Sequence, residues 1–319
     1  MTETPTRHRR RRRGEELMVP DAEFRSYYGR PVVREPTWAA TDIAGYLFLG
    51  GLAGASSVLA AGAELTNRPA LAMTGKVGAL VAITGSTVAL VHDLGRPSRF
   101  ANMLRVFKPS SPMSVGSWLL ATYGPQAGLA AATAVTGKFR GVGRLATFGA
   151  ALVGPAVAAY TGALIADTAV PTWHAGFREL PFVFVGSAAA AAGGLGMIGA
   201  PVDQAGPARR AVLLGAALDV VASKRMERGM GVAAEPLRTG TAGRLLRTAE
   251  ILTVGGAVVG GVLGKRSRMA AVLGGVAALA GSACTRFGIF HAGVASAKDP
   301  KYTVVPQRER LRERESPAG

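Results

Sequence analysis

The sequence contains very few cysteine, histidine, aromatic or charged residues. Of its 319 residues one is cysteine, Cys284, and four are histidine. A single cysteine cannot form an intramolecular disulfide, hold an iron–sulfur cluster or complete a thiolate zinc site. Aromatic residues make up 6% and charged residues 18%, whereas 49% of the residues are hydrophobic and 43 are glycine. This composition is too apolar for a soluble domain and is typical of closely packed membrane helices.

The four histidines are also badly placed for haem. A membrane b-type haem needs two histidines that face each other inside a helix bundle. His8 lies in the N-terminal arm, His92 and His174 lie at the ends of apolar runs, and His291 lies near the end of the last run. Neither a phosphate-binding glycine loop with its lysine nor a nicotinamide or flavin fingerprint occurs. The chain is therefore predicted to carry no metal, haem or iron–sulfur cluster of its own.

The net charge of +17 comes from lysine and arginine residues at the termini and in short loops between apolar runs. In a soluble protein such a charge would indicate nucleic acid, but this distribution indicates membrane topology instead. Residues 9–13 are five consecutive arginines. We interpret them as a flexible arm beside an anionic membrane surface, and we expect no nucleic-acid partner.

Apolar stretches of about 20 residues, the length that crosses a bilayer, predict an all-α polytopic membrane bundle of about eight helices in two four-helix halves. The stretches are residues 43–63, 69–91, 113–135, 145–166, 180–202, 211–225, 245–264 and 269–289. The sixth is short and carries Asp219, so it is either a polar span or a helix lying on the membrane, and we favour a span. Small residues four apart, such as Gly50 and Gly54, indicate close helix packing.

Eight spans place both termini on one side of the membrane. That side carries 25 lysine and arginine residues and the other carries 10. The positive-inside rule then predicts a multi-pass protein of the plasma membrane with both termini in the cytoplasm. We divide the chain into a basic cytoplasmic and partner-docking arm (1–38), a first bundle (39–202), a second bundle (203–297) and a charged tail (298–319).

Ionisable and hydroxyl side chains gather at the end of the spans that shares a side with the N-terminus. Such groups are costly in a membrane, so each is a functional candidate. The candidates for quinone binding and proton transfer are Asp42, Tyr46, His92, Asp93, Arg96, Tyr160 and Asp167. A quinone head group needs hydrogen-bond donors for two carbonyls and a carboxylate or histidine to move protons. The alternative is that these residues are helix caps and interfacial anchors.

Other polar and aromatic residues have a structural alternative too. Asp219, Lys224, Glu227, Arg247 and Glu250 form either a proton route or paired charges at helix ends. Glu64 and Lys76 lie on the face opposite the quinone candidates. The three tryptophans, Trp38, Trp118 and Trp173, are predicted to form an interfacial belt.

Five segments resemble the NrfD-type family, the membrane subunits of polysulfide reductase. The segments are YYGRPVVREPTWAATDIAGYLFLGGLAGASSVLAAGA at 27–63, HDLGRPSRFANMLRVFKPSSPMSVGSW at 92–118, YTGALIADTAVPTWH at 160–174, ELPFVFVGSAAAAAGG at 179–194 and, more weakly, ASAKDPKYTVVPQ at 295–307. Their order and spacing make the resemblance specific, and it covers most of the chain.

The resemblance implies an eight-helix membrane anchor without haem that exchanges electrons between quinone, either menaquinone or ubiquinone, and a ferredoxin-like iron–sulfur subunit. That subunit serves a molybdenum or tungsten bis-pterin enzyme of anaerobic respiration, of the polysulfide, nitrite or formate type. The resemblance places the quinone in the first four helices, on the partner side. The expected docking residues are Tyr27, Tyr28, Arg30, Trp173 and His174. Relatives with a periplasmic partner would have this face outside, whereas the charge count here places it inside.

Two other functions remain open on the sequence. A secondary transporter also has polar breaks in glycine-rich helices, although the charges cluster at one rim and no inverted repeat is evident. A structural anchor would tether a complex without binding quinone.

Overall fold

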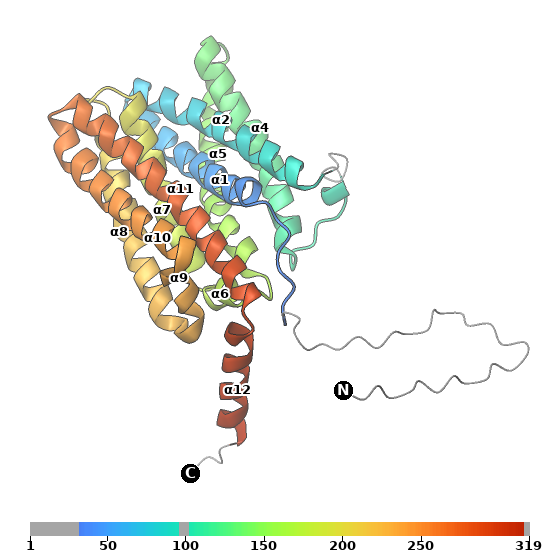
Figure 1. Cartoon of the computed structure of the whole chain (residues 1–319). Helices are drawn as coiled ribbons and strands as arrows, with labels where there is room; N and C mark the ends of the chain where they lie inside the picture. The colour runs from blue at the N-terminus through green and yellow to red at the C-terminus, as the bar shows by residue number, and fades with distance from the viewer. Residues whose placement is uncertain (1–31, 96–101, 316–319) are drawn as a thin grey trace, which may run out of the picture. The chain divides into compact units, whose positions relative to one another are not determined.

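The computed structural model describes residues 32–95 and 102–315, and all the regular structure in these ranges is helical (Figure 1). The long helices are α1 (Ala40–Leu65), α2 (Pro69–Asp93), α4 (Pro112–Thr136), α5 (Arg140–Ala166), α7 (Leu180–Gly199), α8 (Gly206–Gly229), α10 (Gly240–Gly256) and α11 (Arg268–Lys298). Short helices α6 (Pro171–Ala175), η1 (Gly231–Ala234) and α9 (Glu235–Arg238) lie in the connections. Helix α10 continues through η2 (Ala257–Val262) and η3 (Leu263–Lys265), and α12 (Lys301–Glu315) follows α11.

Local sequence explains where the helices begin and end. Pro69 and Pro112 occupy first-turn positions, where proline has no hydrogen bond to lose and its fixed φ suits a helix. Helix α4 ends at Gly137, whose φ of 70° is the left-handed conformation that closes a helix most easily with glycine. Ser267 accepts a hydrogen bond from the Ala270 amide at the start of α11.

All eight apolar stretches predicted from the sequence are helical, which confirms the all-α membrane fold. Among the described residues, six helices are long and apolar enough to cross a membrane: α1, α2, α5, α7, the continuous Gly240–Lys265 segment and α11. Helices α4 and α8 have similar lengths, 25 and 24 residues, but they do not meet this criterion: α4 has Pro125 and Gln126 in its interior, and α8 carries several charges. Eight crossings thus remain a prediction, while eight long helices in the described part of the chain are an observation.

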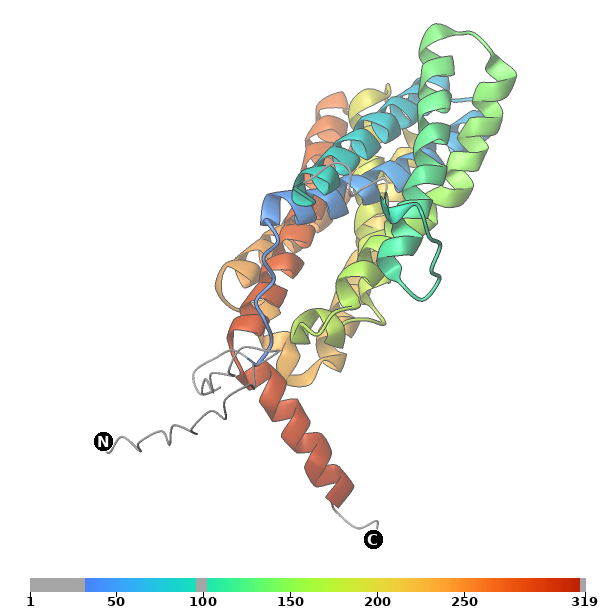
Figure 2. The same cartoon turned by 90° about the vertical axis from the view of Figure 1, so that its right-hand side faces the viewer.

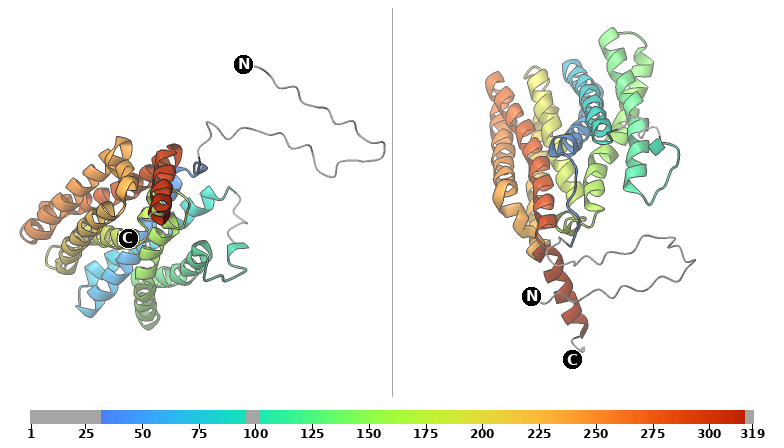
Figure 3. Two further views of the ribbon diagram at one scale, coloured as in Figure 1. Left: turned by 90° about the horizontal axis from the view of Figure 1, so that it is seen from below. Right: turned by 45° about the vertical axis from the view of Figure 1, so that its right-hand side comes forward.

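The long helices between residues 40 and 298 form two packed halves. Helices α1, α2, α4 and α5 pack together as the first half, and α7, α8, α10 and α11 as the second. Helices α1 and α7 lie at the centre and contact members of both halves. Helices α4 and α5 lie at one edge and α10 and α11 at the other (Figures 2 and 3). Residues 31–319 form one compact unit with two hydrophobic clusters, and each cluster contains residues from both predicted bundles.

Successive long helices run in opposite directions, so their ends gather at two faces. We call the end where α1 begins and α11 finishes the first face, and the opposite end the second face. The first face also carries α6, η1 and α9. There, Lys301 at the start of α12 binds Glu235 of α9 with an Nζ–Oε2 distance of 2.6 Å. This hydrogen bond to a carboxylate raises the pKa of Lys301 above its ordinary value.

Glycine allows α1 and α5 to touch backbone to backbone. A Cβ added to Gly54 would overlap the Gly154 carbonyl oxygen, and one added to Gly154 would overlap that of Gly54. The two helix backbones can approach this closely only because both residues have a hydrogen in place of a side chain. The sequence-based expectation of close packing through small residues is confirmed at this crossing.

An arginine joins two of the long helices of the second half, α7 and α11, at the second face. The guanidinium of Arg268, the first residue of α11, donates to the carbonyls of Met197 and Ala200, both at 2.6 Å, and to that of Ile198. These carbonyls end α7, where they have no partner within the helix. A cation at a helix C-terminus also interacts favourably with the helix dipole.

Candidate functional site

A cavity of about 500 Å³ opens near the first face, within the first half of the bundle. Its wall is formed by the segment before α1, the start of α1, the end of α2, the start of α4 and the end of α5. Most of its lining is apolar, including Ile43, Leu47, Leu120 and Ile165. Its polar lining is small: Tyr46, Asp93, Ser111, Ser117, Tyr160, Asp167 and Thr168. A mostly apolar cavity with a few polar groups is the usual form of a small-molecule site.

Two tyrosines face each other in this cavity. Tyr46 comes from the second turn of α1 and is 2% exposed, and its hydroxyl interacts with that of Tyr160 on α5. Gly116 of α4 makes room for Tyr160, because a Cβ at Gly116 would overlap the tyrosine ring and hydroxyl. Each phenol both donates and accepts a hydrogen bond, so the pair presents a polar point in an apolar wall.

Two carboxyl groups and a histidine connect the cavity to the surface. Asp93, the last residue of α2, lines the cavity and interacts with the nearby carboxyl of Asp42. Asp42 lies in the first turn of α1, and its Oδ2 is 2.8 Å from Nδ1 of His92. The Asp42 side chain is 18% exposed and that of His92 is 77% exposed. The three groups therefore lead outward from the cavity to the first face.

The predicted quinone-site residues are largely brought together. Tyr46, Asp93, Tyr160 and Asp167 line the cavity, with Asp167 exposed at the end of α5. Asp42 and His92 lie at its rim. Arg96 and the docking residues Tyr27, Tyr28 and Arg30 lie outside the described residues. Sequence reasoning did not single out Ser111, Ser117 or Gly116, although a serine directly before a helix-starting proline, as at Ser111, is a recognisable signal.

Trp173 lies inside the bundle, not on the surface of the chain. It is fully buried, its Nε1 donates to the Ile289 carbonyl at 2.8 Å, and its ring stacks on Trp38 with a centroid distance of 6.0 Å. The predictions that Trp173 is an interfacial belt residue and docks a partner are therefore wrong, because tertiary stacking against Trp38 and Phe290 covers the indole. His174, the next residue, is exposed and stays a docking candidate.

Comparison with family models matches residues 33–201 to the family described as Polysulphide reductase, NrfD. The match spans more than half of the 319 residues. The chain belongs to the NrfD family.

NrfD proteins are membrane subunits of oxidoreductase complexes. The matched region contains every described residue of the first-face cavity, from Trp38 to Thr168, and ends just after α7. A comparison with curated proteins finds no match. The matched region thus includes the cavity, but the match names no substrate or partner for this chain.

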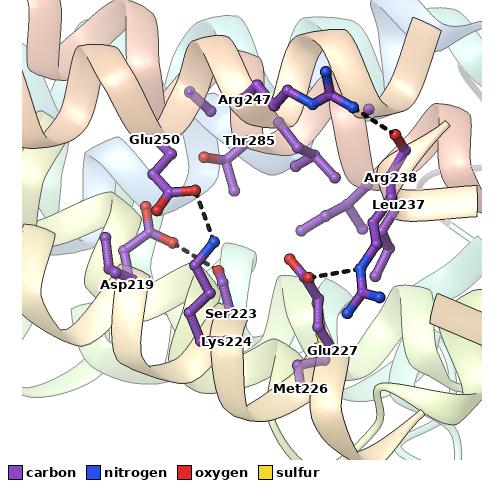
Figure 4. Close-up of a pocket in the computed structure, with 15 residues that line it drawn as sticks. Asp219, Ser223, Lys224, Met226, Glu227, Leu237, Arg238, Arg247, Glu250 and Thr285 are labelled. Atoms are coloured by element: carbon purple, nitrogen blue, oxygen red, sulfur yellow. Dashed lines mark hydrogen bonds and ion pairs between the residues drawn. The ribbon is translucent and has the colours of Figure 1, made fainter. Parts of the chain in front are cut away.

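A second cavity, of about 320 Å³, lies in the second half of this NrfD protein between α8, α10 and α11. Figure 4 shows charged side chains around it, most of them paired. Lys224 binds Glu250 at 2.9 Å and Arg238 binds Glu227 at 3.1 Å. Arg247 donates to the Arg238 carbonyl at 3.2 Å. This pairing favours the interpretation of these residues as stabilising helix-end charges.

A buried cation lies deeper in the bundle, beside Asp219. Arg286 of α11 is fully buried, donates to the Phe184 carbonyl at 2.8 Å and stacks on the Phe184 ring at 3.8 Å. Asp219 is 5% exposed and interacts electrostatically with Arg286. Sequence reasoning missed Arg286, although a lone arginine inside an apolar run is a signal in itself. Within the described ranges, no three metal-ligating side chains gather in this half or the other.

Proposed function

We propose that this chain is the quinone-reactive membrane subunit of a multi-subunit oxidoreductase. The single observation that carries the proposal is the first-face cavity, which combines a mostly apolar lining with the polar groups of Tyr46, Tyr160 and Asp93. A quinone head group fits this chemistry, because its ring and isoprenoid tail favour apolar walls and its carbonyls accept hydrogen bonds from phenols. Menaquinone and ubiquinone both meet this description.

Under this proposal the residues of the cavity have distinct roles. Tyr160 and Tyr46 orient the head group by donating hydrogen bonds to a carbonyl. Asp93 exchanges protons with the adjoining quinol oxygen, and Asp42 and His92 pass them to the first face. Oxidising a quinol releases two protons and two electrons, and reduction of a quinone takes up the same number. The protons travel through side chains of this chain, while the electrons require an acceptor or donor that another subunit holds.

The proposed partners are a ferredoxin-like iron–sulfur subunit and, beyond it, a molybdenum or tungsten bis-pterin enzyme. NrfD membership supports a partner of this kind. The first face is the side expected to meet it, because the cavity opens there and electron transfer favours a short distance. His174 and the segment 27–30 are the proposed contacts.

Replacing Asp93 with asparagine or Tyr160 with phenylalanine tests the proposal in the purified complex. We expect quinone-linked turnover to fall by about 10²-fold or more, the scale of losing a positioned acid–base group. The partner's activity with an artificial electron carrier should be unchanged. Matched controls are Asp203→Asn, an exposed aspartate of the second face, and Tyr123→Phe, a buried tyrosine outside this cavity.

Identification of the proteins that copurify with this chain distinguishes the proposed function from the structural-anchor and transporter alternatives. Recovery of an iron–sulfur subunit together with a bis-pterin enzyme supports the proposal. Recovery of those subunits without binding of a quinone analogue would indicate a structural anchor. A protein that purifies alone and moves a solute across vesicle membranes would be a secondary transporter.

A further inference from the structure

A basic pocket of about 400 Å³ lies at the second face, far from the proposed quinone site. It is formed by the α1–α2 connection, the end of α4 and the start of α5. Its charged lining consists of four cations, Arg68, Lys76, Arg140 and Arg144, and one acid, Glu64. The formal charge of the described lining is therefore +3. The quinone chemistry does not require this concentration of positive charge.

The inner wall of the pocket is held in place by the fold. Lys76, in the second turn of α2, is 8% exposed and binds Glu64 of α1 through its ammonium group. Arg68 donates from Nη1 to the carbonyls of Asp203 at 3.0 Å and Gln204 at 3.4 Å, so its guanidinium is fixed against the α7–α8 connection. Carbonyls leave the arginine charge unneutralised. Two cations are thus positioned before any ligand arrives.

The outer wall offers two cations that the described residues leave without an acid. Arg140 and Arg144 lie four residues apart on α5, so they project from the same side of its first turns. Both are exposed, and neither forms an ion pair with any residue in the ranges 32–95 and 102–315. The Arg144 guanidinium lies over the Phe148 ring, 5.9 Å from its centroid, a contact with the face of the group. The N–H groups at its edge, like those of Arg140, can bind a phosphate with two parallel hydrogen bonds.

The surroundings of the pocket indicate which anion it takes. Met73, one of its lining residues, is 38% exposed, and the outer surfaces of α2 and α4 beside it expose Val81 at 65% and Val135 at 67%. A cationic pocket at the end of membrane helices, with an apolar surface next to it, can bind both the charged head group and the acyl chains of a phospholipid. A free phosphate would use only the charged part.

We propose that this pocket binds the head group of an anionic phospholipid, whose acyl chains lie along α2 and α4. Arg140, Arg144 and Arg68 contact the phosphate, and the Lys76–Glu64 pair forms the floor. Such a lipid would bridge the α1–α2 connection and the α4–α5 hairpin, which projects at the edge of the bundle (Figure 2). The inference does not depend on the proposed function.

Native mass spectrometry of the full chain, after exchange into vesicles of phosphatidylglycerol and phosphatidylcholine, tests the site. The wild type should retain phosphatidylglycerol in preference to phosphatidylcholine. The double variant Arg140→Gln/Arg144→Gln should retain less by on the order of tenfold, because each basic side chain near an anionic lipid strengthens its binding by roughly fivefold. Both arginines are exposed, so their replacement should leave the thermal unfolding of lipid-free protein unchanged.

The matched control is Lys265→Gln/Arg266→Gln, which removes the same charge from exposed residues of the second face outside the pocket. It should retain lipid as the wild type does. Equal retention by the wild type and the Arg140/Arg144 variant would overturn the proposal. So would an equal loss in the control, which would indicate general surface charge. Inorganic phosphate that binds the detergent-solubilised protein and displaces the lipid would identify a phosphate site instead.

Discussion

At the scale of single residues, the arrangement of the first-face cavity depends on the absence of a side chain at Gly116. Gly116 has no Cβ, and the ring of Tyr160 occupies the space that a Cβ would fill. The position of one tyrosine hydroxyl is therefore fixed by a glycine on another helix. Catalytic geometry in bundles of small residues is set in this way by close approach rather than by long side chains.

Replacing Gly116 with alanine is expected to push Tyr160 away from Tyr46. Overpacking of this kind costs about 1–3 kcal/mol, and a shift of about 1 Å at a reacting centre reduces turnover by on the order of 10²-fold. Quinone-linked turnover of the purified complex measures the effect. Gly124→Ala is the control on the same helix, because a Cβ there meets nothing within 4 Å. Normal turnover in Gly116→Ala would show that Tyr160 does not orient the head group.

At the scale of helices, the Arg268 contact holds the end of α7 against the start of α11. The three carbonyls it binds are the ones a helix end leaves unpaired. The arginine thereby replaces a cap that the α7 sequence does not supply. A glycine or asparagine there would have capped α7 locally, without joining it to another helix.

Arg268→Gln should lower the free energy of unfolding by about 2 kcal/mol, the scale of a hydrogen bond to a charged group. Thermal unfolding in detergent measures the change. Arg266→Gln, two residues earlier and without side-chain bonds to α7, should unfold like the wild type. If both variants unfold at the wild-type temperature, the contact contributes nothing to stability.

The positions of the helices could be predicted from the sequence, whereas the contacts of side chains inside the bundle were less predictable. Apolar runs with glycine at four-residue spacing gave all eight long helices, but the 15-residue stretch 211–225 grows to 24 residues in α8 because its polar ends are helical too. Asp93 and Tyr160 were predictable as costly groups at span ends. Ser117 and the buried Trp173 were not, because packing between distant helices, which no local pattern encodes, determines what each side chain meets.

At the scale of the whole molecule, the orientation in the membrane follows from two predictions, the positive-inside rule and eight crossings. The charge count predicts a cytoplasmic first face. Helix α8 determines whether the tail returns to that side, since it is the most polar of the long helices in the described chain.

Cysteine labelling tests both predictions. In a Cys284→Ser background, Asp203→Cys lies before α8 and Gly229→Cys lies at its end, and both positions are exposed. An impermeant maleimide added to intact cells should label Asp203→Cys and not Gly229→Cys. The reverse pattern would place the first face outside. Equal labelling of the two positions would show that α8 lies on the membrane surface. The background protein without new cysteines should not be labelled.

The stacked pair of Trp38 and Trp173 gives the molecule an optical reporter of its own. Trp38 lines the first-face cavity and lies against Trp173 with an interplanar angle of 17°. Trp118, the remaining tryptophan, lies on α4 beside Phe107. One tryptophan thus lines the cavity and a second stacks on it, and a quinone is an efficient acceptor of their excitation energy. Binding at this site is therefore expected to be visible as a loss of tryptophan emission, without any label.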